Sequence, residues 1–85
     1  MTREEARSSI VQYFIDNFVF DGKLSVTDDE SLQGAGVIDS AGVLALVVFL
    51  EEKFGIALGG DDVRPENLDT IANLVNFVMR KREGG

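Results

Sequence analysis

An aspartate followed by a serine, at the predicted start of a helix, is the residue pair in this chain best placed for chemistry. Asp39 and Ser40 follow a long segment without helical periodicity, and the residues after them are apolar almost to Phe54. The first backbone N–H groups of a helix lack intrahelical partners and form the positive end of its dipole, so a phosphate ester on the serine would be stabilised. An Asp–Ser pair also begins many ordinary helices. The pair alone leaves both interpretations open.

The chain lacks the two residue types that most often act as enzyme bases and nucleophiles. Its 85 residues include no histidine and no cysteine, which removes imidazole bases, thiol nucleophiles, disulfides and the usual zinc sites. An EF-hand calcium loop fits only in part: Val19 stands where an oxygen ligand belongs, and Asp28 where a bidentate glutamate belongs. We therefore expect no catalytic residue and no metal site.

The charge of the chain favours protein partners. Fifteen acidic residues against eight basic ones give a formal net charge of −7, which repels nucleic-acid phosphates and anionic lipid and attracts basic patches on proteins. No apolar run approaches the ~20 residues of a membrane span, and residues 1–10 lack the pattern of a signal peptide. We expect a monomer in the cytoplasm that binds neither nucleic acid nor membrane.

Apolar periodicity predicts an all-α chain organised as one domain over residues 1–85. A capping box of Thr2 and Glu5 is expected to open the first helix. Asp39 is expected to cap the second helix, which Gly55 ends, and Asp69 is expected to cap the last. The expected helices cover, in chain order, residues 3–18, 39–54, 61–66 and 69–82.

The segment between the first two expected helices has neither helical nor alternating periodicity. It contains loop-forming residues such as the triplet Gly34-Ala35-Gly36, and a loop of roughly twenty residues is uncommon without a function or a constraint. Its apolar residues are spaced so that the loop can be anchored on the core; they are Leu24, Val26, Leu32, Val37 and Ile38.

The helix over 39–54 is more apolar than a surface helix requires. One apolar stripe, at residues 43, 46, 47, 50 and 54, is the expected core face. A second stripe has the spacing i, i+3, i+4, i+7, so its members share a face beside Ser40; they are Ala41, Leu44, Ala45 and Val48. A helix this short cannot bury both stripes, so we expect the second to reach solvent and bind a partner. In the opposing interpretation, the loop from Val19 to Ile38 covers it.

The segment GVIDSAGVLALVVFLEEKF, from Gly36 to Phe54, resembles the phosphopantetheine attachment region of acyl carrier proteins. The resemblance extends over nearly the whole chain, because the order of helices and loops and the later stretch PENLDTIANLVNFV are also similar to the family. It implies an all-α, four-helix bundle with a long loop between the first two helices and a short third helix. It also implies that the chain is not an enzyme.

The resemblance implies roles for two residues. Ser40 would carry a covalent 4′-phosphopantetheine arm, and Asp39 would help to bind metal in the transferase that attaches it. The arm would hold an acyl or aminoacyl group as a thioester, in fatty-acid, polyketide or other specialised biosynthesis. The partners would be a phosphopantetheinyl transferase, an acyl- or aminoacyl-activating ligase, and synthase or acyltransferase enzymes.

The chain departs from the family at three positions near Ser40. Ala41 stands where the family usually has leucine, and Gly42 and Ala45 stand where acidic residues are common on the exposed helix face. The departures favour a specialised stand-alone carrier over the housekeeping fatty-acid carrier. An aminoacyl or peptidyl carrier paired with an adenylating enzyme is the alternative. An unmodified structural subunit with the same fold is the alternative of another class.

The C-terminal Gly84-Gly85 suggests one further class of protein. Ubiquitin-like modifiers and sulfur carriers are activated at such an end, but their bodies are rich in strands. Because this chain has no period-two alternation, a frayed end explains the two glycines better.

Overall fold

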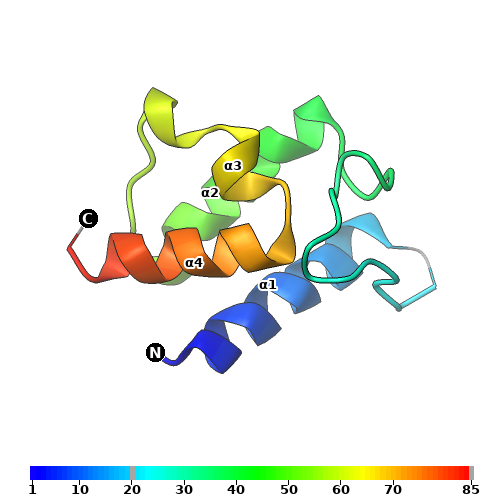
Figure 1. The fold of residues 1–85 in the computed structure, drawn as a ribbon, viewed down its shortest axis with the longest axis horizontal. Coiled ribbons are helices and arrows are strands. Elements are labelled where there is room, and N and C mark those ends of the chain that lie inside the picture. Colours follow the sequence, from blue (N-terminus) through cyan, green and yellow to red (C-terminus); the bar gives the residue numbers. More distant parts are fainter. Residues whose placement is uncertain (20, 85) are drawn as a thin grey trace.

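A computed structural model describes residues 1–19 and 21–84 of the chain. These residues form four α-helices and one 3₁₀ turn, joined by loops, and they contain no strand. The fold class is thus the predicted one. Figure 1 shows the long loop between the first two helices at one end of the molecule, opposite the N-terminus and the end of the last helix. The elements are α1 (Arg3–Phe18), α2 (Ser40–Phe54), η1 (Gly60–Asp62), α3 (Pro65–Leu68) and α4 (Ile71–Arg82).

Helix α1 begins at the predicted capping box. The Glu5 backbone N–H donates to Thr2 Oγ1 at 3.1 Å, and the Thr2 N–H donates to Glu5 Oε1 at 2.8 Å. These bonds to Thr2 lower the pKa of the Glu5 carboxyl, and they satisfy two N–H groups that the helix cannot pair itself. The apolar stripe of the helix is fully buried at Ala6, Ile10 and Phe14.

Asp39 and Gly55 set the ends of α2, as predicted, although the helix proper starts one residue later than expected. Asp39 is extended and is the N-cap, so Ser40 is the first helical residue. Gly55 has a φ of +66° and donates its N–H to the Glu51 carbonyl at 3.0 Å. This left-handed conformation is costly for a residue with a Cβ, which explains the glycine at this helix end.

The short third helix is present as α3, but its predicted bounds, residues 61–66, are wrong. The chain forms the 3₁₀ turn η1 and then α3, and Arg64 between them is extended, with φ −147° and ψ 154°. Proline disfavours the helical conformation of the residue before it, while its own fixed φ suits the first helical position. Pro65 therefore interrupts the expected helix and begins α3.

Helix α4 begins two residues later than predicted, and Asp69 is not its N-cap. Thr70 takes that place, because its Oγ1 accepts a hydrogen bond from the Asn73 N–H at 3.0 Å. The Asp69 carboxylate instead accepts hydrogen bonds from the Ser31 hydroxyl and from the Gln33 backbone N–H. Asp69 therefore anchors the long loop rather than capping the helix that follows it.

The core lies between α1, α2 and α4, and α3 and the long loop close it. Leu32 and Ile38 of the loop are buried, and Leu24, Val26 and Val37 pack against the core from partly buried positions. The predicted anchoring of the loop is confirmed. The other elements contribute buried apolar side chains beyond those of α1, namely Leu46, Leu50, Phe54, Leu68, Ile71, Leu74, Val75, Phe77 and Val78.

Polar contacts also hold the loop against two helices. Arg7 of α1 donates two hydrogen bonds to the Asp28 carboxylate, at 2.9 and 2.7 Å. The Asp28 carbonyl accepts from the Ala72 N–H of α4 at 2.9 Å, and the Asp69 carbonyl accepts from the Leu32 N–H at 2.7 Å. The segment that leads to Ser40 is thus tied to α1, α3 and α4.

Candidate functional site

Ser40 is exposed in the first turn of α2, next to backbone groups that can bind an anion. The Gly42 N–H donates a hydrogen bond to Asp39 Oδ1 at 2.8 Å, and the Val43 N–H donates one to the Asp39 carbonyl at 3.1 Å. Within the described residues, the N–H groups of Ser40 and Ala41 make no hydrogen bond to the chain. The turn therefore presents two N–H donors and the positive end of the helix dipole beside the Ser40 hydroxyl.

Gly42 is buried beneath this turn, so its expected place on the exposed face of α2 is wrong. A Cβ at this position would lie 2.7 Å from Ile38 Cγ1 and 3.0 Å from Phe18 Cε1. The first distance is shorter than real Cβ atoms show and the second is tighter than most of their contacts, so a methyl group would displace its neighbours. The glycine lets the end of α1 and the end of the loop pack directly against the turn that carries Ser40.

Asp39 is exposed, and the structure engages only part of its carboxylate. Oδ1 accepts from the Gly42 N–H, and within the described residues Oδ2 makes no hydrogen bond. The described residues also contain no group of three or more acidic side chains arranged to hold a metal ion. Asp39 therefore has an oxygen available to a ligand brought by another protein.

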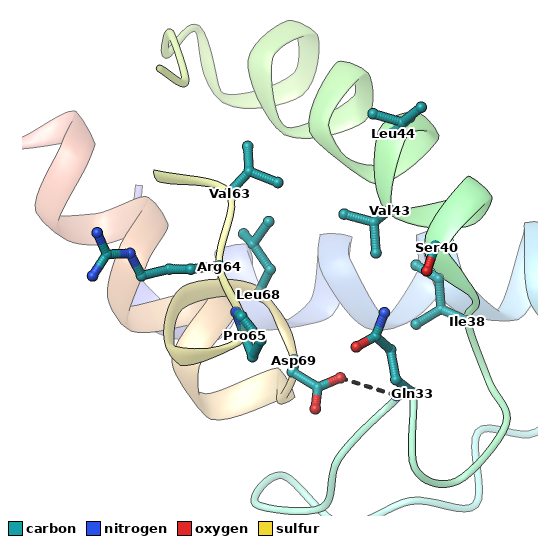
Figure 2. Close-up of a pocket in the computed structure, with 10 residues that line it drawn as sticks. All are labelled: Gln33, Ile38, Ser40, Val43, Leu44, Val63, Arg64, Pro65, Leu68 and Asp69. Carbon is teal, nitrogen blue, oxygen red and sulfur yellow. Dashed lines mark hydrogen bonds between the residues drawn. The ribbon is translucent and has the colours of Figure 1, made fainter. Parts of the chain in front are cut away.

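An apolar cleft of about 260 Å³ opens beside Ser40, between α2 and the segment from Val63 to Asp69 (Figure 2). Three polar residues besides Ser40 also line it: Gln33, Arg64 and Asp69. The apolar lining consists of Ile38, Val43, Leu44, Val63, Pro65 and Leu68. An apolar cleft with a few polar groups is the usual form of a site for a small organic group.

A second hollow lies on the loop side of Ser40. It is lined by residues of the loop that precede α2, together with Phe18 from the end of α1. Gln33, Ile38 and Ser40 line both hollows. A group attached to the Ser40 hydroxyl would therefore lie against one or both of these surfaces.

The second apolar stripe of α2 is exposed, as predicted. Leu44 exposes 69% of its surface and Val48 exposes 51%, and Ala41 and Ala45 are also exposed. The interpretation in which the long loop covers this face is wrong for the described residues. The stripe begins directly after Ser40, so an apolar surface adjoins the exposed hydroxyl.

Val63 extends this surface across the cleft, and the sequence did not reveal it. It is 39% exposed and lines the same cleft as Leu44. Its neighbours Asp62 and Arg64 are charged, and it belongs to no periodic stripe. Because only the turn between η1 and α3 brings Val63 near α2, the sequence offered no signal beyond a lone valine between charges.

The chain resembles known proteins over almost its full length. Residues 22–78 match the family described as "Phosphopantetheine attachment site". The chain is 35% identical over 79 residues to the acyl carrier protein of Tropheryma whipplei (strain Twist), and the match covers 93% of both chains. It is 25% identical over 73 residues to the "Probable acyl carrier protein PigG" of Serratia sp. (strain ATCC 39006), which covers 86% of this chain and 84% of that protein.

The chain belongs to the acyl carrier protein family. Its function is therefore to carry an acyl group, not to catalyse a reaction, and its cofactor is 4′-phosphopantetheine. Acyl carriers work with synthase and transferase enzymes. Among the described residues, none of the helices combines the length and the apolar character needed to cross a membrane.

The start of α2 fits this cofactor on three counts. It presents an exposed hydroxyl that can form a phosphoester, and it has two N–H groups of the first turn that can bind the phosphate oxygens. The adjoining cleft has apolar walls for the alkyl parts of the arm and a few polar groups for its amides.

Proposed function

We propose that this acyl carrier holds its 4′-phosphopantetheine arm on Ser40. The proposal rests mainly on the first turn of α2, where an exposed hydroxyl lies beside two N–H groups without a partner in the described chain. The other serines lack this setting. Ser8 and Ser9 lie within α1, Ser25 lies in the loop, and Ser31 donates its hydroxyl to Asp69.

In the attachment step, Ser40 Oγ takes the phosphopantetheinyl group of coenzyme A. The new Oγ–P bond forms while the diphosphate P–O bond breaks, so the nucleotide leaves with its phosphates and the hydroxyl proton goes to a base of the transferase or to water. The N–H groups of Ser40 and Ala41 then hold the phosphate at the positive end of α2. The arm's terminal thiol supplies the thioester chemistry, so the chain needs no cysteine.

Asp39 serves the transferase in this proposal. The Gly42 N–H holds one oxygen of its carboxylate at 2.8 Å, which fixes the side chain beside Ser40. The other oxygen has no partner in the described residues, which supports its use as a ligand of the metal ion in the transferase. The helix N-cap and the metal contact then use different oxygens of one carboxylate.

Partner enzymes dock on the exposed face of α2. This recognition face consists of Ala41, Leu44, Ala45 and Val48, and we add Val63 across the cleft. From Ser40 to Leu50 the helix has no charged side chain, although the whole chain has a net charge of −7. The contact with α2 is therefore apolar. This supports a specialised carrier, served by its own activating ligase and its own synthase or acyltransferase.

The proposal includes a monomer that acts in the cytoplasm, where its transferase finds coenzyme A. An exposed apolar face beside the attachment serine suits transient contacts with successive enzymes. A permanent partner on this face would block the arm.

Intact mass tests the proposed attachment. After incubation with coenzyme A and a broad-specificity phosphopantetheinyl transferase, the wild-type chain should gain one phosphopantetheine and Ser40→Ala should gain none. Ser25→Ala is the matched control, because it removes another exposed serine, and it should be modified like the wild type. Circular dichroism should show all three chains folded. Modification of Ser40→Ala would overturn the assignment.

A further inference from the structure

Gln33 lies beside Ser40 at a position fixed by the fold. The residue before it, Leu32, is fully buried and donates its N–H to the Asp69 carbonyl at 2.7 Å. Gln33 donates its own N–H to Asp69 Oδ1 at 2.9 Å, and the Ser31 hydroxyl binds the other oxygen of that carboxylate. The backbone of Gln33 is thus held by the core on one side and by Asp69 on the other.

The side-chain amide of Gln33 has no hydrogen-bond partner among the described residues. In Figure 2 it projects into the cleft from the loop, toward Val43 of α2 and on the same side as Ser40. Apart from Ser40 itself, Gln33 is the polar residue that lines both hollows next to the attachment serine. Gln33 therefore borders both surfaces against which a group attached to Ser40 can lie.

The other two polar residues of the cleft, Asp69 and Arg64, are held by other contacts or directed elsewhere. Both oxygens of Asp69 accept hydrogen bonds from the loop. Arg64 donates Nε–H to the Asp61 carbonyl at 2.9 Å, and one of its terminal nitrogens lies 3.8 Å from Glu66 Oε2. Figure 2 also shows the Arg64 guanidinium directed away from Ser40. Gln33 is left as the polar side chain able to bind a ligand in this part of the cleft.

The chemistry of an amide side chain matches the first part of the arm. A glutamine side chain offers two N–H donors and a carbonyl acceptor, and the arm beyond its phosphate bears a hydroxyl group and then an amide. The phosphate itself has the N–H groups of α2. The walls near Gln33, at Ile38 and Val43, are apolar, and a few well-placed polar groups in an apolar cleft fix the orientation of a ligand.

We propose that the Gln33 side-chain amide hydrogen-bonds the hydroxyl and amide groups of the arm next to its phosphate, and so directs the arm along the cleft. Gln33 is then a cofactor-binding residue. The inference rests on the proposed attachment at Ser40, and it adds a residue that binds the arm next to its phosphate.

Nuclear magnetic resonance of the apo and phosphopantetheine-loaded chain tests this inference without relying on activity. The chain has two glutamines, Gln33 and Gln12, and Gln12 binds Asp16 within α1, so its side-chain NH₂ signals are an internal control. Loading should shift the NH₂ signals of Gln33 and leave those of Gln12 in place. If the Gln33 signals stay in place in a chain whose mass confirms loading at Ser40, the inference fails while the attachment proposal stands.

Two variants make the test independent of chemical-shift interpretation. In loaded Gln33→Leu, the amide proton of the arm next to the phosphate should exchange with solvent about fivefold faster than in the wild type, as expected for the loss of one neutral hydrogen bond. Gln12→Leu should exchange like the wild type. The phosphorus signal should be the same in all three chains. A phosphorus shift without faster exchange in Gln33→Leu would mean that Gln33 binds the phosphate, and it would overturn the assignment to the arm's amide.

Discussion

At the scale of single residues, Leu44 and Leu46 show how two leucines only two positions apart in α2 differ in role. Leu44 is 69% exposed on the proposed recognition face, whereas Leu46 is fully buried in the core. Substitutions of exposed side chains usually change the free energy of unfolding by no more than ~0.5 kcal/mol. Truncation of a buried leucine costs about 2–5 kcal/mol. The two positions can therefore separate recognition from stability.

We predict that Leu44→Glu melts within a few degrees of the wild type but is loaded or acylated much more slowly by its native partner enzymes. The physical reason is that the docked complex would bury an unpaired carboxylate. Leu46→Ala is the matched control: it should lower the melting temperature clearly while leaving the partner KM of the folded fraction unchanged. Leu44→Glu with full partner activity would rule out the recognition face.

Residue roles could be predicted from the sequence where the physical cause is local. Asp39 as a helix cap and Gly55 as a helix end depend only on their neighbours in the chain, and both are confirmed. Gly42, Val63 and Gln33 could not be assigned in this way. The buried position of Gly42 and the proposed roles of the other two depend on the approach of Phe18 to α2, on the turn after η1, and on the carboxylate of Asp69. None of these leaves a periodic signal.

At the scale of elements, the ion pair of Arg7 and Asp28 joins α1 to the long loop. The hydrogen bonds from Arg7 lower the pKa of the Asp28 carboxyl. The two side chains are 51% and 45% exposed, so solvent screening limits the pair to about 0.2–1 kcal/mol. Because the folded pKa is lowered, this stabilisation is complete above the ordinary aspartate pKa of about 3.9. It is lost as the pH falls through the lowered value.

A double-mutant cycle with Arg7→Met, Asp28→Ala and the double variant should measure this coupling. The cycle subtracts the effect of each single change in net charge. We predict a coupling free energy of about 0.2–1 kcal/mol at pH 7, the same value at pH 5, and a loss below the ordinary aspartate pKa. Urea unfolding at each pH supplies the free energies. A coupling free energy that persists at pH 2 would show that the Arg7–Asp28 ion pair does not cause the coupling.

The order of elements could be predicted from the sequence, but two helix starts could not. Pro65 prevents the helix expected over 61–66, and the competition between Asp69 and Thr70 decides where α4 begins. Both residues are good N-caps in isolation. Asp69 does not cap α4, because Ser31 and Gln33, nearly forty residues earlier, donate hydrogen bonds to its carboxylate. A contact between segments so far apart leaves no trace in local sequence patterns.

At the scale of the whole molecule, the net charge of −7 acts against the folded state. Like charges lie closer together in the compact chain than in the unfolded one, so folding costs electrostatic free energy that salt reduces. Three ion pairs stabilise the folded state instead; they are Arg7–Asp28, Arg64–Glu66 and Lys81–Asp62. Because fifteen acidic residues face eight basic ones, repulsion outweighs these partly exposed pairs.

We predict that added salt raises the melting temperature. In a domain of this size, each ~1 kcal/mol of relieved repulsion raises it by about 4–8 °C. Potassium chloride and millimolar magnesium chloride should act equally at equal ionic strength, because screening, not a specific metal site, is the cause. A melting temperature that does not change with ionic strength would contradict this account. A rise confined to magnesium would indicate a bound ion.

Identification of the serine that carries the arm in the loaded chain is the sharpest test of the proposed attachment. Trypsin cleaves after Lys23 and Lys53, so the peptide 24–53 contains Ser25, Ser31 and Ser40 together. Fragmentation of this peptide by tandem mass spectrometry, after loading with coenzyme A and the transferase, separates the three serines. We predict phosphopantetheine on Ser40 alone, with Ser25 and Ser31 unmodified. Phosphopantetheine on Ser25 or Ser31, or a chain that stays unmodified under conditions that load another acyl carrier, would contradict it.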